Sequence, residues 1–271
     1  PGMIKRHKKV FAILGTRDGI QNLARDLVTW GMEDVMLYTG ERLSYENEVL
    51  KTGKPEEFLD YEADALSVVY VENPKAEPEN ATHGIPDEEF LREKVPMTKE
   101  EVRTVSLSKL RLKEDSVCYD VGAGTGSVSI EMAKRAWKGR VFAIEKKPLA
   151  VELLKKNREK FAAENLEVIE GVAPEALENL ETPTHAFIGG SSGNMETILN
   201  LLLNKNPKVR MVINCIALET VAETLACLKK LPVKETEILQ LAVSKAKTVG
   251  SYHMMMGENP IYIISCTGAG H

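Results

Sequence analysis

The part of the sequence best suited to chemistry is a glycine-rich turn between a strand-like run and a helix-like stretch. It reads Asp120-Val121-Gly122-Ala123-Gly124-Thr125-Gly126, with glycines at every second position. Glycine has no Cβ, so it adopts positive φ and lets a ligand approach the main chain. The helix predicted directly after the turn offers free N–H groups to a polar ligand. The pattern predicts a binding site at the carboxyl end of a strand, although such a turn can also be purely structural.

A carboxylate follows at the end of the next predicted strand. Residues 140–145 read Arg-Val-Phe-Ala-Ile-Glu, and Glu145 stands nineteen residues after Gly126. An acid at that place can accept hydrogen bonds from both hydroxyls of a ribose. The leading acid and the glycine spacing differ from the dinucleotide fingerprint Gly-x-Gly-x-x-Gly. The turn resembles instead the first motif of Rossmann-like methyltransferases that use S-adenosylmethionine, in which no pyrophosphate has to be bound.

Composition and charge limit the possible classes of protein. With 271 residues, of which 43% are hydrophobic and 28% charged, the chain fits one large or two modest globular domains. No apolar run reaches the roughly 20 residues that a membrane-spanning helix needs. The basic first residues lead into a strand without a cleavage site, so we expect no signal peptide and a cytoplasmic protein. The net charge of −5 disfavours non-specific binding of nucleic acid.

The cysteines are scattered and form no Cys-x-x-Cys pair of the kind that suggests a metal or redox site. Three of the four fall in apolar, strand-like runs. We therefore predict buried free thiols, and no metal site, for Cys118, Cys215, Cys227 and Cys266.

Residues 1–73 are predicted to form a small α/β half-domain that buries little surface by itself. It contains one amphipathic helix, with Asp18 as the predicted N-cap, and strand-like runs at 9–15, 35–38 and 65–71. Residues 74–83, rich in proline and charge, are predicted to be a linker.

A short run in this half-domain resembles a known family. Residues 40–48 read Gly-Glu-Arg-Leu-Ser-Tyr-Glu-Asn-Glu, which is similar to the late part of a tetrapyrrole-methylase domain that methylates carbon 5 of precorrins. The resemblance implies that residues 1–73 are the C-terminal part of such a domain. They lack the glycine motif of its first half, so we expect no methylase activity from them. An unrelated docking domain is the alternative interpretation.

Residues 84–271 alternate strands and helices, which predicts an α/β fold. Thr98 followed by Glu101 predicts a capping box at the start of a helix. We expect a Rossmann-like class I methyltransferase fold, with a doubly wound, mostly parallel sheet of seven strands. The resemblance implies that the last two strands, 236–243 and 260–266, form an antiparallel pair. Between them, residues 251–257 are predicted as an apolar loop that either packs on the core or lines a pocket for a bulky ligand.

Further runs resemble the decarboxylating half of precorrin-6Y carbon 5,15-methyltransferases over residues 84–267. The runs Pro96-Met97-Thr98-Lys99 and Ile188-Gly189-Gly190-Ser191-Ser192-Gly193 are more specific than the glycine turn. A carbon-5-type domain directly before a carbon-15-type domain is also the order of the fused enzyme of cobalamin biosynthesis. The resemblance implies methyl transfer from S-adenosylmethionine, which becomes S-adenosylhomocysteine, to carbon 15 of precorrin-6B. Carbon dioxide is lost from the acetate on carbon 12, and the product is precorrin-8.

The resemblance and the expected sheet edge together predict the site residues. We expect the methyl donor to be bound by Thr98, Asp120, Gly122, Ala123, Gly124, Thr125, Gly126, Glu145, Lys146, Val172, Ala173 and Gly189. Val172 departs from the pattern, because methyltransferases of this type often carry an acid there. The adenine amino group would then be left to backbone groups.

The substrate is a polycarboxylate, and charge-assisted pairs with carboxylates are strong. We expect it to be bound by Met97, Lys99, Arg103, Gly190, Ser191, Ser192, Gly193, Asn214, Lys245 and Lys247. His253 or Tyr252 is the candidate acid that reprotonates the decarboxylated product, although a histidine in an apolar loop is more often only hydrogen-bonded there.

Two other functions stay open at the level of the sequence. A transfer RNA methyltransferase would need a basic, aromatic-laced groove, which the acidic balance and the 6% aromatic content disfavour. A non-catalytic protein that holds S-adenosylmethionine or a dinucleotide is the second alternative. We expect a tetrapyrrole substrate, no nucleic-acid or membrane partner, and a homo-oligomer, for which the family suggests a tetramer.

Overall fold

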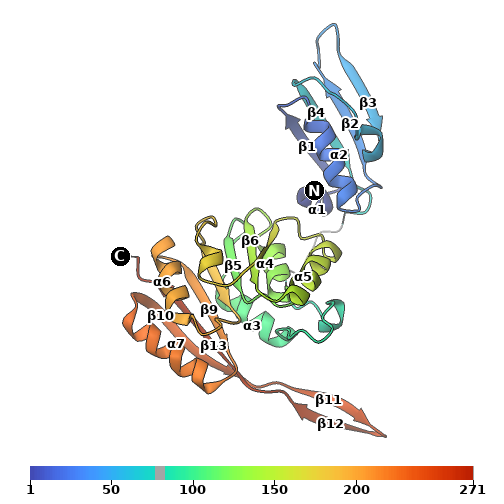
Figure 1. Ribbon diagram of the computed structural model, residues 1–271. Coiled ribbons are helices and arrows are strands. Elements are labelled where there is room, and N and C mark those ends of the chain that lie inside the picture. Colours follow the sequence, from blue (N-terminus) through green and yellow to red (C-terminus); the bar gives the residue numbers. More distant parts are fainter. Residues whose placement is uncertain (77–82, 271) are drawn as a thin grey trace. The chain divides into compact units, whose positions relative to one another are not determined.

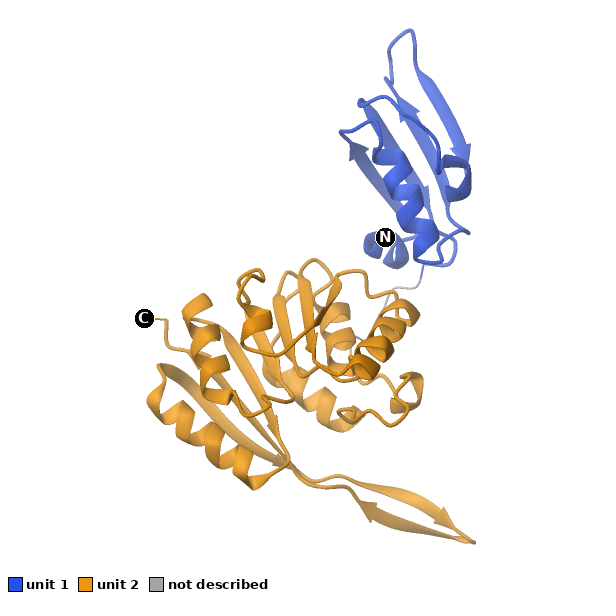
Figure 2. Cartoon of the chain, in the orientation of Figure 1, with its two compact units in different colours: residues 1–80 blue, residues 81–271 orange. Residues whose placement is uncertain are grey.

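The computed structural model describes residues 1–76 and 83–270 and divides the chain into two compact units (Figure 1, Figure 2). Unit 1 comprises residues 1–80 and unit 2 residues 81–271. Most of the predicted linker at 74–83 lies outside the described residues. None of the helices in the described ranges is long and apolar enough to span a bilayer.

Unit 1 is a four-stranded antiparallel sheet of order β1-β4-β2-β3. Its elements are α1 (Gly2–Arg6), β1 (Lys9–Leu14), α2 (Gly19–Thr29), β2 (Met36–Glu41), β3 (Val49–Gly53), η1 (Pro55–Phe58) and β4 (Ser67–Glu72). Residues of α1, α2 and η1 join one core cluster on a single face of the sheet. The opposite face exposes Phe11, Ile13 and Leu50.

The sequence prediction for unit 1 omitted α1 and β3. Strand β3 has no alternation of apolar and polar residues, and both Val49 and Leu50 are exposed. Its assignment depends on pairing with β2, from Leu37 opposite Gly53 to Glu41 opposite Val49. Asp18 is the N-cap of α2, as predicted, but its side chain does not cap the helix.

Unit 2 contains a seven-stranded sheet of order β10-β13-β9-β8-β5-β6-β7. The five strands from β9 to β7 are parallel, and β13 and β10 pair antiparallel at one side. The strands are β5 (Val117–Val121), β6 (Arg140–Glu145), β7 (Leu166–Glu170), β8 (His185–Ile188), β9 (Arg210–Cys215), β10 (Val233–Leu241) and β13 (Ile261–Gly268). The predicted doubly wound, mostly parallel sheet is confirmed.

Helices cover both faces of this sheet. They are η2 (Asp87–Glu89), α3 (Glu100–Leu110), α4 (Ser127–Arg135), α5 (Pro148–Lys160), η3 (Glu175–Leu177), α6 (Met195–Lys205) and α7 (Leu218–Lys230). One core cluster joins α6 and α7 to side chains such as Tyr119, and the other joins α3, α4 and α5 to side chains such as Cys118. Successive residues of β5 thus point into opposite cores, as a strand buried on both faces requires.

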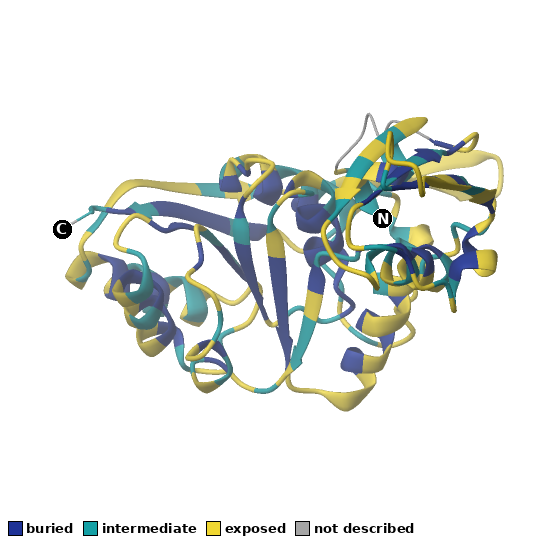
Figure 3. Ribbon diagram, turned by 90° about the horizontal axis from the view of Figure 1, so that it is seen from above, coloured by how far each residue is buried: buried dark blue, intermediate teal, exposed yellow. Residues whose placement is uncertain are grey.

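Burial is nearly complete along the central strands (Figure 3). All four cysteines are buried free thiols, as predicted. Because the strands are parallel, their carboxyl ends meet at one edge of the sheet. Four residues therefore lie along that edge: Gly122 after β5, Glu145 at the end of β6, Gly189 after β8 and Asn214 near the end of β9.

The prediction of an apolar loop at 251–257 is wrong. The chain forms a two-stranded hairpin of β11 (Ser244–Val249) and β12 (Tyr252–Gly257), which extends away from the seven-stranded sheet (Figure 1). All of its residues are exposed, so the three methionines do not pack on the core of the described residues. Lysines of β11 face methionines of β12 across the hairpin, and sequence patterns that look for apolar alternation do not detect such a pair.

The capping box predicted at the start of α3 does not form. The helix begins at Glu100 with Lys99 as its N-cap, and the N-cap residue makes no side-chain capping hydrogen bond. The first N–H group of the helix is instead bound by Asp87, because Glu100 N donates to Asp87 Oδ1 at 3.0 Å. A carboxylate from a distant segment replaces the local cap.

Candidate active site

The glycine turn after β5 needs its glycines for two reasons. Gly122, Gly124 and Gly126 have φ angles of +78°, +57° and +80°, which favour glycine. A Cβ on Gly122 would lie 2.9 Å from the backbone of Gly190, and a Cβ on Gly124 would lie 3.0 Å from the carbonyl oxygen of Pro96. The bare backbone of the turn thus lies directly against two other segments of the site.

Glu145 is fixed at the end of β6 by main-chain groups. Its Oε2 accepts a hydrogen bond from Gly124 N at 2.9 Å, and its Oε1 accepts from Lys146 N and Lys147 N, both at 2.9 Å. The residue is 8% exposed. A carboxylate oxygen accepts more than one hydrogen bond, so the group can still bind hydroxyls of a ligand.

A cavity of about 220 Å³ opens beside this carboxylate, and we call it the donor cavity. One side is the turn and the end of β6, and the other is formed by the loops after β7 and β8. The lining residues are Val95, Pro96, Val121, Gly122, Gly124, Ile144, Glu145, Lys146, Lys147, Ala150, Gly171, Val172, Ala173, Gly190, Ser191 and Ser192. Lys146 Nζ donates to Ser192 Oγ at 2.9 Å, which joins the two sides.

A larger cavity of about 580 Å³ lies on the other side of the turn, and we call it the acceptor cavity. Its lining consists of Pro96, Met97, Thr98, Lys99, Val102, Gly122, Ala123, Gly124, Gly189, Asn214, Ile216, Gly257, Glu258, Asn259 and Ile261. It shares Pro96, Gly122 and Gly124 with the donor cavity. The two cavities therefore meet along the bare backbone of the turn, where a small group can pass from one ligand to another.

Two buried polar atoms beside the turn have no hydrogen-bond partner among the described residues. They are Asp120 Oδ1 and Thr125 Oγ1. The other oxygen of Asp120 accepts from Ser129 Oγ. Burial raises the pKa of Asp120 to about 7, the hydrogen bond from Ser129 opposes the rise, and the charge of Glu145 adds to it. The turn therefore retains two buried oxygens without a partner among the described residues, at a cost in stability.

The predicted donor residues divide into three groups. Those that line the donor cavity are Gly122, Gly124, Glu145, Lys146, Val172 and Ala173. Thr98, Ala123 and Gly189 line the acceptor cavity. The third group, Asp120, Thr125 and Gly126, lines neither cavity and is buried beneath the turn. Thr125, for example, is 1% exposed, and its carbonyl accepts a hydrogen bond from Asn157 Nδ2 at 2.9 Å.

The predicted substrate residues are only partly brought together. Met97, Lys99 and Asn214 line the acceptor cavity, whereas Gly190, Ser191 and Ser192 line the donor cavity and Gly193 lines neither. Asn214 Nδ2 donates to Ser106 Oγ at 3.0 Å, which fixes the amide.

Five further predicted site residues also line neither cavity. Arg103 is completely buried and is bound to Asp87 and Glu131, so the prediction that it binds the substrate is wrong. The other four stand on the exposed β11–β12 hairpin and line neither cavity: Lys245, Lys247, Tyr252 and His253. Lys245 is paired with Glu101 at 2.8 Å.

Sequence reasoning missed the segment that follows the hairpin. Glu258 and Asn259 line the acceptor cavity, and Glu258 N donates to Val243 O at 2.8 Å, which closes the base of the hairpin. Asn259 forms an Asn-Pro pair with Pro260. That pair was the available signal, but nothing in its type or spacing indicated a place beside the turn.

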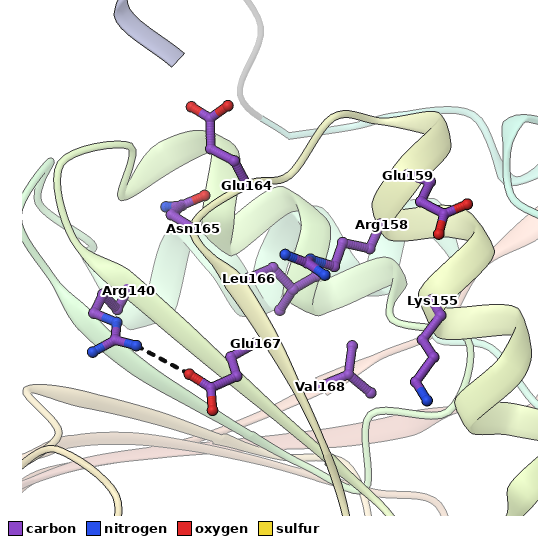
Figure 4. Close-up of a pocket in the computed structure, with 9 residues that line it drawn as sticks. All are labelled: Arg140, Lys155, Arg158, Glu159, Glu164, Asn165, Leu166, Glu167 and Val168. Atoms are coloured by element: carbon purple, nitrogen blue, oxygen red, sulfur yellow. Dashed lines mark hydrogen bonds and ion pairs between the residues drawn. The ribbon is translucent and has the colours of Figure 1, made fainter. Parts of the chain in front are cut away.

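A further hollow of about 370 Å³ lies at the opposite ends of β6 and β7 (Figure 4). It is lined by acidic and basic side chains, and the guanidinium of Arg140 binds Glu167 at 3.0 Å and Glu181 at 3.5 Å. This hollow is at the amino ends of the strands, whereas ligands of open α/β sheets bind at the carboxyl ends. We therefore assign the site to the donor and acceptor cavities.

A doubly wound sheet of this order, with a bare glycine turn after one strand and an acid ending the next, defines a Rossmann-like methyltransferase. Residues 89–267 match the family model described as a precorrin methyltransferase domain. The chain belongs to the precorrin methyltransferase family.

Proteins of similar sequence and structure agree with this placement. A probable cobalt-precorrin-6B C(15)-methyltransferase (decarboxylating) of Sulfurisphaera tokodaii is 44% identical over 188 residues, which cover 67% of this chain and 95% of the relative. The cobalt-precorrin-6B C(15)-methyltransferase (decarboxylating) of Salmonella typhimurium is 39% identical over 182 residues, 66% of this chain and 94% of the relative. The crystal structure of precorrin-6Y C5,15-methyltransferase from Geobacter metallireducens has a TM-score of 0.66 and 38% identity, and the match covers 69% of this chain and 99% of that one.

Proposed function

We propose that this protein is a decarboxylating C-methyltransferase of cobalamin biosynthesis. It moves a methyl group from S-adenosylmethionine to carbon 15 of precorrin-6B, and decarboxylation of the acetate on carbon 12 completes the conversion to precorrin-8. S-adenosylhomocysteine is the spent donor. The observation that carries the proposal is the meeting of the donor and acceptor cavities along the backbone of Gly122 and Gly124. Family membership and the names of the relatives support the same reaction.

The lining of the donor cavity suits the nucleoside of S-adenosylmethionine. Glu145 is the residue for the ribose hydroxyls, since its oxygens retain lone pairs beyond the amide hydrogen bonds. Ile144, Val172 and Ala173 offer apolar contact for the adenine ring. No carboxylate stands at position 172, so the adenine amino group is left to main-chain acceptors.

The reaction depends mainly on the alignment of the two reactants. S-adenosylmethionine supplies an electrophilic methyl group whose sulfonium leaves readily, and the reduced tetrapyrrole supplies an electron-rich carbon. Correct placement of two reactants can account for about 7–11 kcal/mol of barrier lowering. When carbon dioxide leaves, its electron pair enters the conjugated macrocycle. Neither step requires a nucleophilic Ser, Cys or His.

Lys99 is the best candidate for binding a carboxylate of the macrocycle. Among the described residues that line the acceptor cavity it is the basic one, and 36% of its side chain is exposed. Its ammonium lies 3.3 Å from Asp87, and charge-assisted pairs with a second carboxylate are favourable. Asn214 and Asn259 provide amide groups on the same lining.

Glu258 replaces His253 and Tyr252 as our candidate for the acid that reprotonates the product. It is the acidic residue among the described residues lining the acceptor cavity, whereas the earlier candidates are on the exposed hairpin. Its carboxyl is the acidic group on this lining from which a proton could pass to a carbon of the decarboxylated ring.

We also infer a homo-oligomer in the cytoplasm without a nucleic-acid partner. The net charge of −5 supports the last point. The interpretation of residues 1–73 as part of a tetrapyrrole-methylase domain rests on the Gly-Glu-Arg-Leu run and stays a prediction.

Replacement of Glu145 by alanine tests the donor site. We expect binding of S-adenosylmethionine, measured by isothermal titration calorimetry, to weaken about 10- to 100-fold, because a hydrogen bond to a charged group contributes about 1.5–3 kcal/mol. The matched control is Glu170→Ala, since Glu170 is opposite Glu145 at the end of the neighbouring strand and does not line the cavity.

The wild-type protein should convert precorrin-6B to a product that mass spectrometry identifies as methylated and decarboxylated. Equal affinity of the wild type for NAD and S-adenosylmethionine, or binding of the donor without any turnover of the precorrin, would contradict the proposal.

A further inference from the structure

The end of the segment 84–99, residues 95–99, contributes to the lining of both cavities without belonging to the sheet. Val95 and Pro96 line the donor cavity, and Pro96 with the following three residues lines the acceptor cavity. The carbonyl of Pro96 lies so close to the turn that a Cβ on Gly124 would be 3.0 Å from it. The position of this segment therefore sets the width of both cavities.

A single buried side chain binds this segment near both of its ends. Arg103 of α3 donates from Nη2 to the carbonyl of Ile85 and from Nη1 to the carbonyl of Thr98, the latter at 2.6 Å. Nη1 also donates to Asp87 Oδ1 at 2.9 Å, and Nε donates to Glu131 Oε1 at 2.9 Å. The guanidinium is completely buried. It connects residues 85, 87 and 98 of the segment to the helical layer.

The two carboxylates that bind the guanidinium hold further parts of the same segment. Glu131 of α4 accepts from Gly84 N at 3.1 Å and from Ile85 N at 3.0 Å. Asp87 accepts from Glu100 N at 3.0 Å. The cluster thus fixes the segment against α3 and α4 through main-chain groups on both sides of the arginine.

The chemistry of the cluster favours positioning over simple stabilisation. Burial of ionised groups is costly, and apolar side chains of similar volume often stabilise a core at least as well. A planar guanidinium, however, directs several N–H groups at fixed angles, which an ammonium cannot reproduce. Here four acceptors on four different residues are bound at once. What this arrangement provides is a defined place for the segment.

We propose that Arg103 is a positioning residue, which holds the segment 84–99 at the distance from the glycine turn that the donor and the acceptor require. The inference rests on the proposed function for the identity of the two ligands. Arg103 touches neither ligand and acts through Pro96, Thr98 and Lys99. Loss of its fork geometry should widen both cavities while the sheet and the turn keep their structure.

The test uses Arg103→Lys, which keeps the charge opposite Glu131 but not the fork, and Asp87→Asn, which keeps an acceptor but not the charge. We expect hydrogen exchange to accelerate at the amides of residues 84–99 and not at those of β5 and β6. The dissociation constant of S-adenosylmethionine should rise about tenfold or more, because the donor then binds only the fraction of molecules in which the segment is in place. The KM for the precorrin should rise more than kcat falls.

The matched control is Arg140→Lys. Arg140 also binds two carboxylates, Glu167 and Glu181, but it is half-exposed and lies at the other ends of the strands (Figure 4). The Arg140→Lys variant should have the same hydrogen-exchange rates in residues 84–99 and the same donor affinity as the wild type. Unaltered exchange in residues 84–99 of the Arg103 variant, together with wild-type donor affinity, would overturn the inference. A wild type that binds no donor would instead refute the proposed function, and the exchange comparison would still decide the role of Arg103.

Discussion

Asp120 and Thr125 are two residues of the glycine turn that are buried at a cost in free energy. Both are buried behind the turn, and each has a side-chain oxygen without a hydrogen-bond partner in the described part of the chain. The cost of such atoms is about 1–3 kcal/mol each when nothing satisfies them. A buried carboxylate is costly when it is charged, and Asp120 avoids this cost by binding a proton. Burial therefore raises its pKa to about 7.

Replacement of Asp120 by asparagine should change how stability depends on pH. The pKa of Asp120 is raised from an ordinary 3.8 to about 7, so the folded protein binds more protons than the unfolded chain between these values. The contribution to stability is fully present below pH 3.8 and is lost as the pH rises through about 7. Urea unfolding of both proteins at several pH values should show their difference changing by up to about 1.4 kcal/mol per pH unit in this window. A constant difference between them would contradict the raised pKa.

At the scale of elements, the site depends on three backbone segments in close contact. The turn after β5 lies against the loop after β8 at Gly122 and against the segment 84–99 at Gly124, so glycine occupies the turn's side of both contacts. Glu145 is bound to the same turn by the N–H of Gly124. A change in the backbone of the turn therefore affects both neighbouring segments.

Gly122→Ala should damage this arrangement strongly. Its φ of +78° is unfavourable for alanine, and the new Cβ would lie 2.9 Å from the backbone of Gly190. Strained backbone of this kind costs about 1–3 kcal/mol, before the displaced loop is counted. We expect a lower midpoint of thermal unfolding and loss of donor binding by calorimetry. Gly193→Ala serves as the control, since its φ is also positive but a Cβ there meets nothing within 4 Å; equal losses in both variants would show that contact with Gly190 is unimportant.

At the scale of the whole molecule, the match to the family is confined to one unit. The matched residues, 89–267, lie within unit 2, and the relatives from Sulfurisphaera tokodaii and Salmonella typhimurium are covered over 95% and 94% of their length. Unit 2 has its own two core clusters and all the residues of both cavities.

We therefore expect residues 84–271, produced alone, to unfold cooperatively and to bind S-adenosylmethionine as tightly as the full chain. Circular dichroism on heating and calorimetric titration would measure this. A shortened protein that is unfolded, or whose donor affinity falls tenfold, would mean that unit 1 contributes to the site.

Much of this molecule could be predicted from local sequence. The β-branched run before Asp120, the glycine spacing and the acid at 145 each report a local requirement of the backbone or of a ligand, and the structure places them together. The role of Arg103 could not be predicted, because its burial depends on Glu131, which is 28 residues away and on another helix. The hairpin escaped detection because its lysine–methionine pairs follow neither a buried nor an amphipathic pattern.

The boundary between the two cavities has a consequence for how such proteins diversify. Of the described residues, the cavities have only Pro96, Gly122 and Gly124 in common, and at the two glycines the shared surface is main chain. Asn214, Ile216, Glu258 and Asn259 border the larger cavity alone. Substitution of these four side chains can adapt the acceptor cavity to a new substrate while binding of the nucleoside is unchanged. The acceptor cavity is therefore free to vary in sequence, whereas the donor cavity is constrained by its backbone.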